Sequence, residues 1–227
     1  MLLTGQGHTK CDIMRFRKLD PARDMNEFLV LLTESLRDHP VYSAAKELFA
    51  DNGDYMYFLR TMLATFLRIQ VKYNTVILGT EGDRIVCGAI LRTPKDETPS
   101  KKDFLLSMGL NEKLPASPRE TAEFYNMVMH LDDMTLSVGK EDNWTLTMLS
   151  VKRDMRSRGA GSYFMKNCVI PYVRHHGGRV LTLTAHTSKT AEFYEKMGFE
   201  VFDSTPADYR GRQLYSRCMK LSLDNGE

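Results

Sequence analysis

The sequence contains no apolar run that approaches the ~20 residues needed to cross a bilayer. Its opening, MLLTGQGHTK, lacks the sustained apolar stretch of a signal peptide. A charge excess of one sign is also missing, because the formal net charge is +2 and acidic and basic residues are interspersed. We therefore expect neither a membrane nor a nucleic acid to be the main partner.

Closely spaced cysteine pairs are missing too. The four cysteines, Cys11, Cys87, Cys168 and Cys218, are far apart and form no CxxC motif. We expect each thiol to act as a small apolar side chain in a protein of the reducing cytoplasm. We also expect no metal site.

The composition is that of a soluble globular protein, with 42% hydrophobic and 26% charged residues. A chain of 227 residues can bury a substantial core. We expect a single domain over residues 1–227, with a flexible tail at 1–11. Nothing in the sequence excludes a homodimer.

Apolar periodicity predicts α/β structure. Pro21 near a helix start and Pro40 just past its end bound one amphipathic helix, and the glycine-containing turn EGDR joins two β-branched runs as a hairpin. The expected strands are 12–20, the hairpin 74–92, a short strand before 140, then 144–151, 179–185, 199–203 and 213–222. The expected helices are 21–37, 42–50, one from Asp54, 102–109 within a polar lid at 93–118, 119–131, 162–175 and 188–197. Pro171 should kink or shorten the helix at 162–175.

The stretch RSRGAGSYF, residues 156–164, follows a predicted strand and opens a predicted helix. Amide groups in the first turn of a helix have no internal partner and attract anions. Gly159 and Gly161 let the backbone approach a bulky anion, and Arg156 and Arg158 add positive charge. The motif is neither a Walker loop nor a dinucleotide fingerprint. Taken alone, it fits a phosphate cradle or an ordinary basic turn.

Two motifs in the same order resemble the GCN5-related N-acetyltransferase (GNAT) superfamily, in particular its branch of small-molecule acetyltransferases. LSVKRDMRSRGAGSYFM matches the family's acyl-CoA segment, and AEFYEKMGF matches its late aromatic segment. The likeness covers residues 74–92 and 144–222 well, and 12–37 loosely. Arg153 stands where many relatives have proline, and Thr190 or Ser188 takes the place of a frequent asparagine.

The resemblance implies the GNAT fold, a mixed, V-shaped sheet in which two neighbouring parallel strands splay apart around acetyl-CoA. The acyl-CoA-binding core would be 144–203, and the segments 38–72 and 93–133 would be inserted helices or a lid that shape the acceptor pocket. The pantetheine arm would pair with the backbone at Leu149 and Val151. The implied cofactor residues are Leu149, Ser150, Val151, Arg156, Ser157, Arg158, Gly159, Ala160, Gly161, Ser162, Thr190 and Tyr194.

Acetyl transfer to an amine needs a proton donor for the leaving thiolate and a route for the proton of the amine. The resemblance places Tyr194 beside the sulfur as that donor; otherwise it is a packing aromatic. His186, at the end of a strand next to the gap, is the candidate base. The alternative bases are turn carboxylates at Asp132, Asp133, Glu141 and Asp142.

The leading hypothesis is therefore an acetyl-CoA-dependent N-acetyltransferase acting by direct transfer on the amine of a small molecule. Acetylation of a protein or peptide amine is a second enzymatic hypothesis, and it would require an open groove. A third is a non-catalytic acyl-CoA-binding module, in which Tyr194→Phe would change nothing. An unrelated α/β binding protein would require both motifs to be coincidental.

Overall fold

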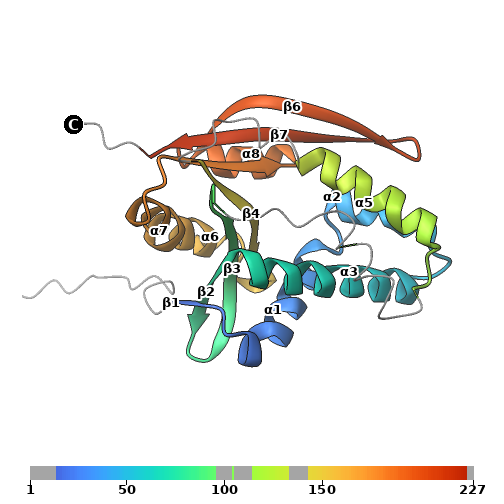
Figure 1. Cartoon of the computed structure of the whole chain (residues 1–227), viewed down its shortest axis with the longest axis horizontal. Helices are drawn as coiled ribbons and strands as arrows, with labels where there is room; N and C mark the ends of the chain where they lie inside the picture. The colour runs from blue at the N-terminus through green and yellow to red at the C-terminus, as the bar shows by residue number, and fades with distance from the viewer. Residues whose placement is uncertain (1–13, 96–103, 105–113, 133–142, 224–227) are drawn as a thin grey trace, which may run out of the picture.

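The computed structural model describes residues 14–95, 104, 114–132 and 143–223. Its centre is a seven-stranded mixed sheet with the order β1-β2-β3-β4-β5-β7-β6 (Figure 1). The strands are β1 (Arg15–Lys18), β2 (Thr75–Glu81), β3 (Arg84–Arg92), β4 (Asn143–Val151), β5 (Val180–Ala185), β6 (Glu200–Tyr209) and β7 (Arg212–Ser222).

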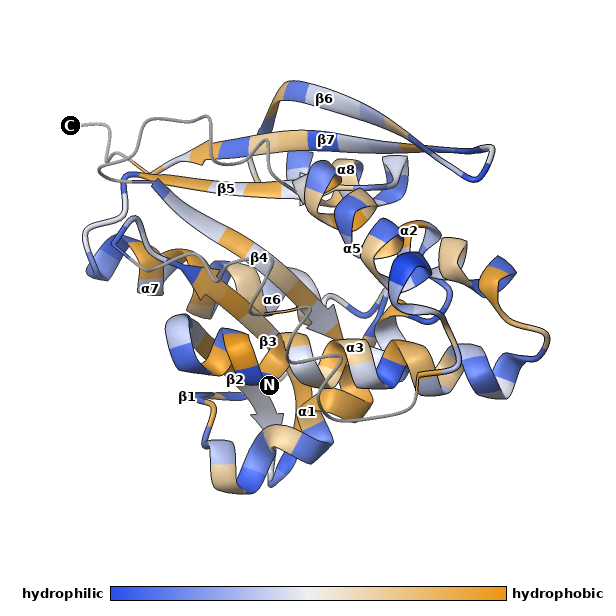
Figure 2. Cartoon of the chain, turned by 45° about the vertical axis from the view of Figure 1, so that its right-hand side comes forward, coloured by the Kyte–Doolittle hydropathy of each residue, from blue (hydrophilic) through white to orange (hydrophobic). Residues whose placement is uncertain are grey.

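Helices cover both faces of this sheet (Figures 1 and 2). The helices are α1 (Pro21–Leu36), α2 (Pro40–Ser43), α3 (Asn52–Tyr73), α5 (Pro118–Asp132), α6 (Ala160–Phe164), α7 (Ile170–His175) and α8 (Ser188–Glu195). A 3₁₀ turn at Ala44–Leu48 continues α2, and a π turn at Met165–Val169 joins α6 to α7 in one continuous helical segment.

The sheet separates two hydrophobic clusters. One lies between the sheet and α1, α3 and α5, and is built from large buried side chains such as Phe28, Phe58 and Phe124. The other lies beneath α6, α7 and α8, around Trp144 and Phe164. Helices on both sides leave the central strands β3 and β4 largely buried, which gives the site a stable framework.

α1 approaches the sheet closely because β3 carries a glycine. A Cβ atom on Gly88 would lie 2.2 Å from a ring carbon of Phe28, far inside van der Waals contact. Any side chain at position 88 would therefore push α1 away from the sheet. This contact matters for function because the carboxyl end of α1 forms part of the site described below.

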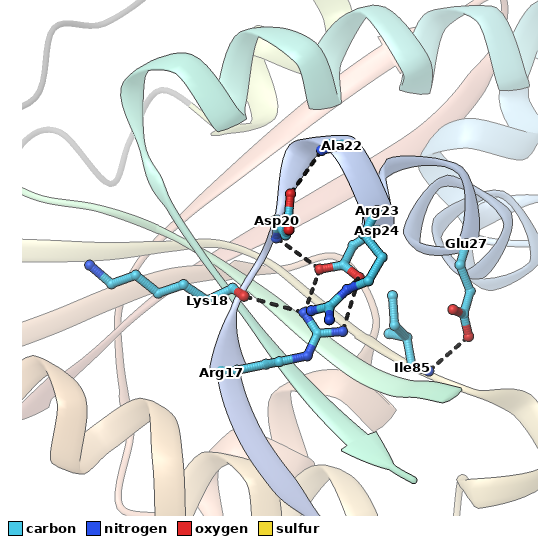
Figure 3. A network of polar contacts seen from close by, with 8 residues as sticks. All are labelled: Arg17, Lys18, Asp20, Ala22, Arg23, Asp24, Glu27 and Ile85. Atoms are coloured by element: carbon cyan, nitrogen blue, oxygen red, sulfur yellow. Dashed lines mark hydrogen bonds and ion pairs between the residues drawn. The ribbon is translucent and has the colours of Figure 1, made fainter. Parts of the chain in front are cut away.

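A buried carboxylate fastens the start of α1 to β1 (Figure 3). Asp24 accepts hydrogen bonds from both terminal nitrogens of Arg17, from Arg23 Nε at 3.0 Å and from the Asp20 amide at 2.8 Å. The Arg17 guanidinium, helped by the other two donors, holds the pKa of Asp24 well below its usual range although burial opposes this. The network thus supplies hydrogen-bond donors and a positive charge to a carboxylate that is only 2% exposed.

β4 and β5 are parallel neighbours that pair over a short length only. Their register runs from Asn143 opposite Val180 to Thr145 opposite Thr182, and no pairing follows beyond that point. From Leu146 to Val151, β4 pairs with β3 alone. Figure 2 shows the two strands diverging from their common end. The V-shaped sheet implied by the family resemblance is confirmed.

The predicted strands and helices are confirmed where the structure describes the chain, with three corrections. Strand 199–203 is longer than expected and reaches Tyr209, because β6 is an edge strand that tolerates Pro206. Pro40 begins the next helix, α2, as well as ending α1. Pro171 neither stops nor shortens the helix, because the π turn directly before it accommodates the ring.

Several sequence-based expectations lie outside the described residues. They are the tail at 1–11, the helix at 102–109 apart from Phe104, and the short strand before 140. Within the described ranges, no helix is long and apolar enough to cross a membrane.

Candidate functional site

A cavity of about 730 Å³ opens where β4 and β5 diverge. Its walls come from the free edge of β4, the loop before α6, the inner side of α8 and the region where α1 gives way to α2. The described lining residues are Ser35, Leu36, His39, Tyr42, Leu146, Thr147, Met148, Leu149, Val151, Arg156, Ser157, Gly159, Gly161, Ser162, Thr184, His186, Lys189, Thr190, Glu192, Phe193, Tyr194 and Lys196.

The loop before α6 presents backbone amides to this cavity. Gly159 has φ +83°, a left-handed conformation that favours glycine. Ser157, which lies between Arg156 and Arg158, has φ +59°. The first helical hydrogen bond runs from the Tyr163 amide to the Gly159 carbonyl at 2.8 Å. The amides of residues 160–162 therefore have no acceptor within the helix. They form the positive end of a helical segment that continues to His175.

Gly161 brings this turn against β4 and α8. A Cβ atom at this position would lie 3.3 Å from Val151 Cγ2 and 3.4 Å from a ring carbon of Phe193. A larger residue would have to displace one of these walls. The second glycine of the motif therefore allows close packing, whereas Gly159 supplies a backbone conformation.

Arg156 is tied to the end of β4. Its Nε donates a hydrogen bond to the Val151 carbonyl at 2.9 Å, and the residue lines the cavity. Partial burial, and to a lesser extent the charge of Arg153, lowers the pKa of Arg156 from its ordinary value. It remains a cation at neutral pH, and an anion in the cavity would relieve both effects.

α8 brings Tyr194 to the cavity. The Thr187 side chain caps the helix by accepting from the Thr190 amide at 3.0 Å. Tyr194 is only 5% exposed and packs edge-on against Phe193 and Phe199. Burial raises the pKa of Tyr194 above its ordinary value, so its hydroxyl keeps its proton throughout the neutral range.

Three rings line the cavity where α2 approaches the end of β5. His186 follows β5, His39 precedes α2, and Tyr42 lies within α2. The His39 ring meets the His186 ring edge-on with centroids 5.4 Å apart, and it meets the Tyr42 ring at 5.7 Å. All three side chains are half-buried. This group is called the ring wall below.

Comparison with known families assigns this site to one of them. The model of the acetyltransferase (GNAT) domain matches residues 102–211, which include β4, the glycine loop and α8. The splayed strands and the cavity between them are the geometry that the two sequence motifs imply for the same family. The chain thus contains an acetyltransferase (GNAT) domain at residues 102–211, a little under half of its length.

Solved GNAT structures share this fold at low sequence identity. Histone acetyltransferase HPA2 and related acetyltransferase from Corynebacterium glutamicum is 16% identical, covers 91% of this chain and 94% of its own, and has a TM-score of 0.58. yncA from Salmonella typhimurium, solved with its cofactor acetyl-CoA, is 15% identical over 93% of this chain and 95% of its own, with a TM-score of 0.54.

A third GNAT structure is the ribosomal-protein-S18-alanine N-acetyltransferase from Escherichia coli. It is 14% identical, covers 94% of this chain and 96% of its own, and has a TM-score of 0.53. Curated protein sequences give no significant match. At these identities the solved structures establish the fold and leave the acceptor open.

The cavity collects most of the residues that the sequence predicted for the cofactor. The predicted residues that line it are Leu149, Val151, Arg156, Ser157, Gly159, Gly161, Ser162, Thr190 and Tyr194, and the predicted base His186 lines it as well. Ser150, Arg158 and Ala160 do not. Strand alternation turns Ser150 away from the cavity, and Ala160 is buried in the core. A cofactor contact at these two would have to be through the backbone.

The helix after the loop begins two residues earlier than the sequence suggested. It starts at Ala160, with Gly159 as its N-cap, and not near Ser162. The left-handed backbone of Gly159 ends the turn and allows helix to start at once. Ser162 therefore lies inside the first turn, facing the cavity, and does not cap the helix.

Sequence reasoning missed the ring wall contributed by α2. Residues 38–72 were expected to shape the acceptor pocket, but neither His39 nor Tyr42 was singled out. A histidine and a tyrosine flanking Pro40 carry no motif, so their place in the site depends on tertiary packing. Of the alternative bases, Asp133, Glu141 and Asp142 lie outside the described residues, and Asp132 ends α5. No cluster of three His, Cys, Asp or Glu side chains suited to a metal occurs among the described residues.

Proposed function

We propose that the chain transfers the acetyl group of acetyl-CoA directly to the amine of a small molecule held between the glycine loop and the ring wall. The observation that carries this proposal is the cavity itself, which is lined both by the cofactor motifs and by residues of the inserted segment 38–48. A small acceptor can be held there beside the cofactor. A protein acceptor would need a groove open along its length.

The described residues fit acetyl-CoA in two respects. The edge of β4 from Leu146 to Val151 has no β5 partner, so its backbone groups can pair with the amides of an extended arm as a strand would. The amides of residues 160–162 and the guanidinium of Arg156 suit a pyrophosphate. Acetyl-CoA, when bound, supplies the acetyl group as an activated thioester.

We assign the proton donor to Tyr194. Its hydroxyl lies on the cavity side of α8 and stays protonated at neutral pH because burial raises its pKa. It can thus give a proton to the departing sulfur as the carbon–sulfur bond breaks. A negative charge developing on sulfur is stabilised by the same hydroxyl, which is a second reason to expect a loss of kcat without it.

We assign the acceptance of the amine's proton to His186. The side chain lines the cavity beside the His39 ring. As the new nitrogen–carbon bond forms, the nitrogen must lose a proton, and an imidazole nitrogen can accept it. The described lining residues include no cysteine, which supports direct transfer over an acetylated enzyme.

The first test is thermal unfolding with and without acetyl-CoA. Ligand at about 100 times its Kd stabilises a protein by ~2.7 kcal/mol, which corresponds to a midpoint rise of roughly 5–10 °C for a domain of this size. The double variant Arg156→Glu, Gly159→Glu should fold yet lose the shift. The absence of a shift in the parent protein would exclude the cofactor site.

The second test separates the acceptor classes. Release of the CoA thiol is measured with a panel of small amines and, in parallel, with peptides that carry free N-terminal or lysine amines. We expect turnover with small amines to exceed that with peptides. Turnover restricted to peptides would overturn the small-molecule proposal while leaving the acetyltransferase activity intact.

A further inference from the structure

The ring wall differs in chemistry from the rest of the cavity. Cationic side chains line the loop and α8, where Arg156, Lys189 and Lys196 lie. The ring wall of the same cavity consists of His39, Tyr42 and His186, and its apolar neighbours come from α1 and β4. Ring edges and faces in a continuous row offer a flat aromatic group the edge-to-face contacts that such groups prefer.

Acidic side chains are scarce around this wall. Among the described lining residues the one carboxylate is Glu192, which comes from α8 and not from the ring wall. A compact aliphatic ammonium would lose hydration on entering and gain no described carboxylate in return. An acceptor that contributes apolar, flat surface gains more from this wall than one that contributes charge alone.

Hydrogen bonds from neighbouring elements fix the backbone of the segment that carries His39 and Tyr42, so the ring wall is ordered before an acceptor binds. The buried hydroxyl of Tyr55 donates to the Arg37 carbonyl at 2.7 Å. On the far side of α2, Arg212 Nη1 of β7 donates to the Ser43 carbonyl at 3.2 Å. These bonds bracket the stretch that carries His39 and Tyr42. A preformed surface binds a rigid partner with little loss of conformational entropy.

We infer that the acceptor is an amine bearing a flat aromatic or heteroaromatic ring, and that His39 and Tyr42 determine this preference. The inference rests on the proposed function and narrows it. The aromatic ring of the acceptor extends the row of His186, His39 and Tyr42, and its amine points back along the cavity toward the thioester. His39 and Tyr42 are thus specificity-determining residues, and neither takes part in proton transfer.

The test compares three amines with the same number of carbon atoms: 2-phenylethylamine, 2-cyclohexylethylamine and n-octylamine. The first two differ in the flatness of the ring, and the third has no ring. With the parent protein and saturating acetyl-CoA, we expect kcat/KM for the phenyl compound to exceed the other two about tenfold, the effect of two edge-to-face contacts.

Variants then assign the preference to its residues. In Tyr42→Leu and His39→Leu the ratio of phenyl to cyclohexyl kcat/KM should fall toward one, while n-octylamine is still acetylated. His39 makes no side-chain capping hydrogen bond to α2, so its loss should leave the helix in place. Tyr215→Leu, at the most exposed of the large apolar positions, is the matched control and should keep the parent ratio.

The outcomes distinguish failure of the aromatic preference from failure of the proposed acetyltransferase function. Equal kcat/KM for the three amines would overturn the aromatic preference and leave small-molecule acetylation standing. A parent-like preference in both variants would remove His39 and Tyr42 as its cause. The absence of turnover with every amine would overturn both proposals.

Discussion

The hydroxyl oxygens of Thr145 and Thr182 lie 3.2 Å apart, at the last paired position before β4 and β5 diverge. Both residues are buried. The Thr182 hydroxyl also lies 3.1 Å from Asn143 Oδ1 and 3.1 Å from the Trp144 carbonyl, and its single proton can serve one of them at a time. A polar cluster thus closes the vertex of the gap in which the cofactor is expected.

Removing one hydroxyl from this cluster should destabilise the protein. In Thr182→Val the Thr145 hydroxyl loses a buried partner, which costs about 1–3 kcal/mol of unfolding free energy. The measurement is urea unfolding at neutral pH. The double variant Thr145→Val, Thr182→Val is the control. It should cost less than the sum of the single variants, because it removes both halves of the pair; strict additivity would show that the contact carries no coupling energy.

Replacing Tyr194 with phenylalanine should lower kcat by about a hundredfold or more, the usual contribution of a positioned acid. The Kd for acetyl-CoA should change little, because the ring that packs against Phe193 and Phe199 is kept. Initial rates of CoA thiol release give kcat, and thermal shifts measured over a range of acetyl-CoA concentrations give the Kd. Tyr215→Phe, an exposed tyrosine outside the cavity, controls for loss of a hydroxyl elsewhere. An unchanged kcat in Tyr194→Phe would remove this residue from the chemistry.

Asp24 should make folding stability depend on pH. Its folded-state pKa lies below the value of an unfolded aspartate, so its contribution is complete above about pH 4 and is lost as the pH falls further. Asp24→Asn should lower the unfolding free energy by about 2–4 kcal/mol at neutral pH, because Arg17 keeps its partly buried charge without a carboxylate. Unfolding curves at neutral pH and near pH 3 test this.

The difference in unfolding free energy between the parent protein and Asp24→Asn should be smaller near pH 3 than at neutral pH. Asp83→Asn, in the exposed turn between β2 and β3, should match the parent at both pH values. A constant difference between parent and Asp24→Asn would show that the carboxylate charge is unimportant.

Arg212 should affect the KM for the amine indirectly, because it fixes the position of α2 and does not itself line the cavity. Arg212→Met keeps the aliphatic stem but removes the donor to the Ser43 carbonyl. A bond to a half-exposed guanidinium is worth about 1 kcal/mol, so KM for the amine should rise roughly fivefold. The Kd for acetyl-CoA should stay unchanged. Arg210→Met, on the same hairpin but paired with Glu120 of α5, is the control; an equal effect of both variants would indicate general loosening.

The segment from β4 to α8 could be predicted closely from its sequence, because local rules govern it. Gly159 has a positive φ that favours glycine, and Gly198 follows α8 with φ +91°. The length of β6 could not be predicted, since Pro206 is excluded from central strands and nothing in the sequence marks this strand as an edge.

For the acceptor side of the cavity, the sequence predicted the contributing segment, residues 38–72, but not the individual side chains. His39 and Tyr42 reach the cavity because α1 lies close to β3 over Gly88, and α2 therefore begins beside the end of β5. That placement depends on contacts between residues far apart in the chain. Periodicity carries no information about it, which is why the pocket was anticipated and its rings were not.

The π turn at Met165–Val169 sets the rotational phase between the two ends of one helix. At the amino end, Phe164 must face Phe16, and at the carboxyl end Tyr172 must face Trp144. One additional residue in the turn reconciles both demands. If the same residues adopted regular α-helical pitch, one end would rotate by about 100° relative to the other. The glycine loop is attached to the amino end, so loss of the π turn without loss of a residue would swing the amides of residues 160–162 away from the cavity.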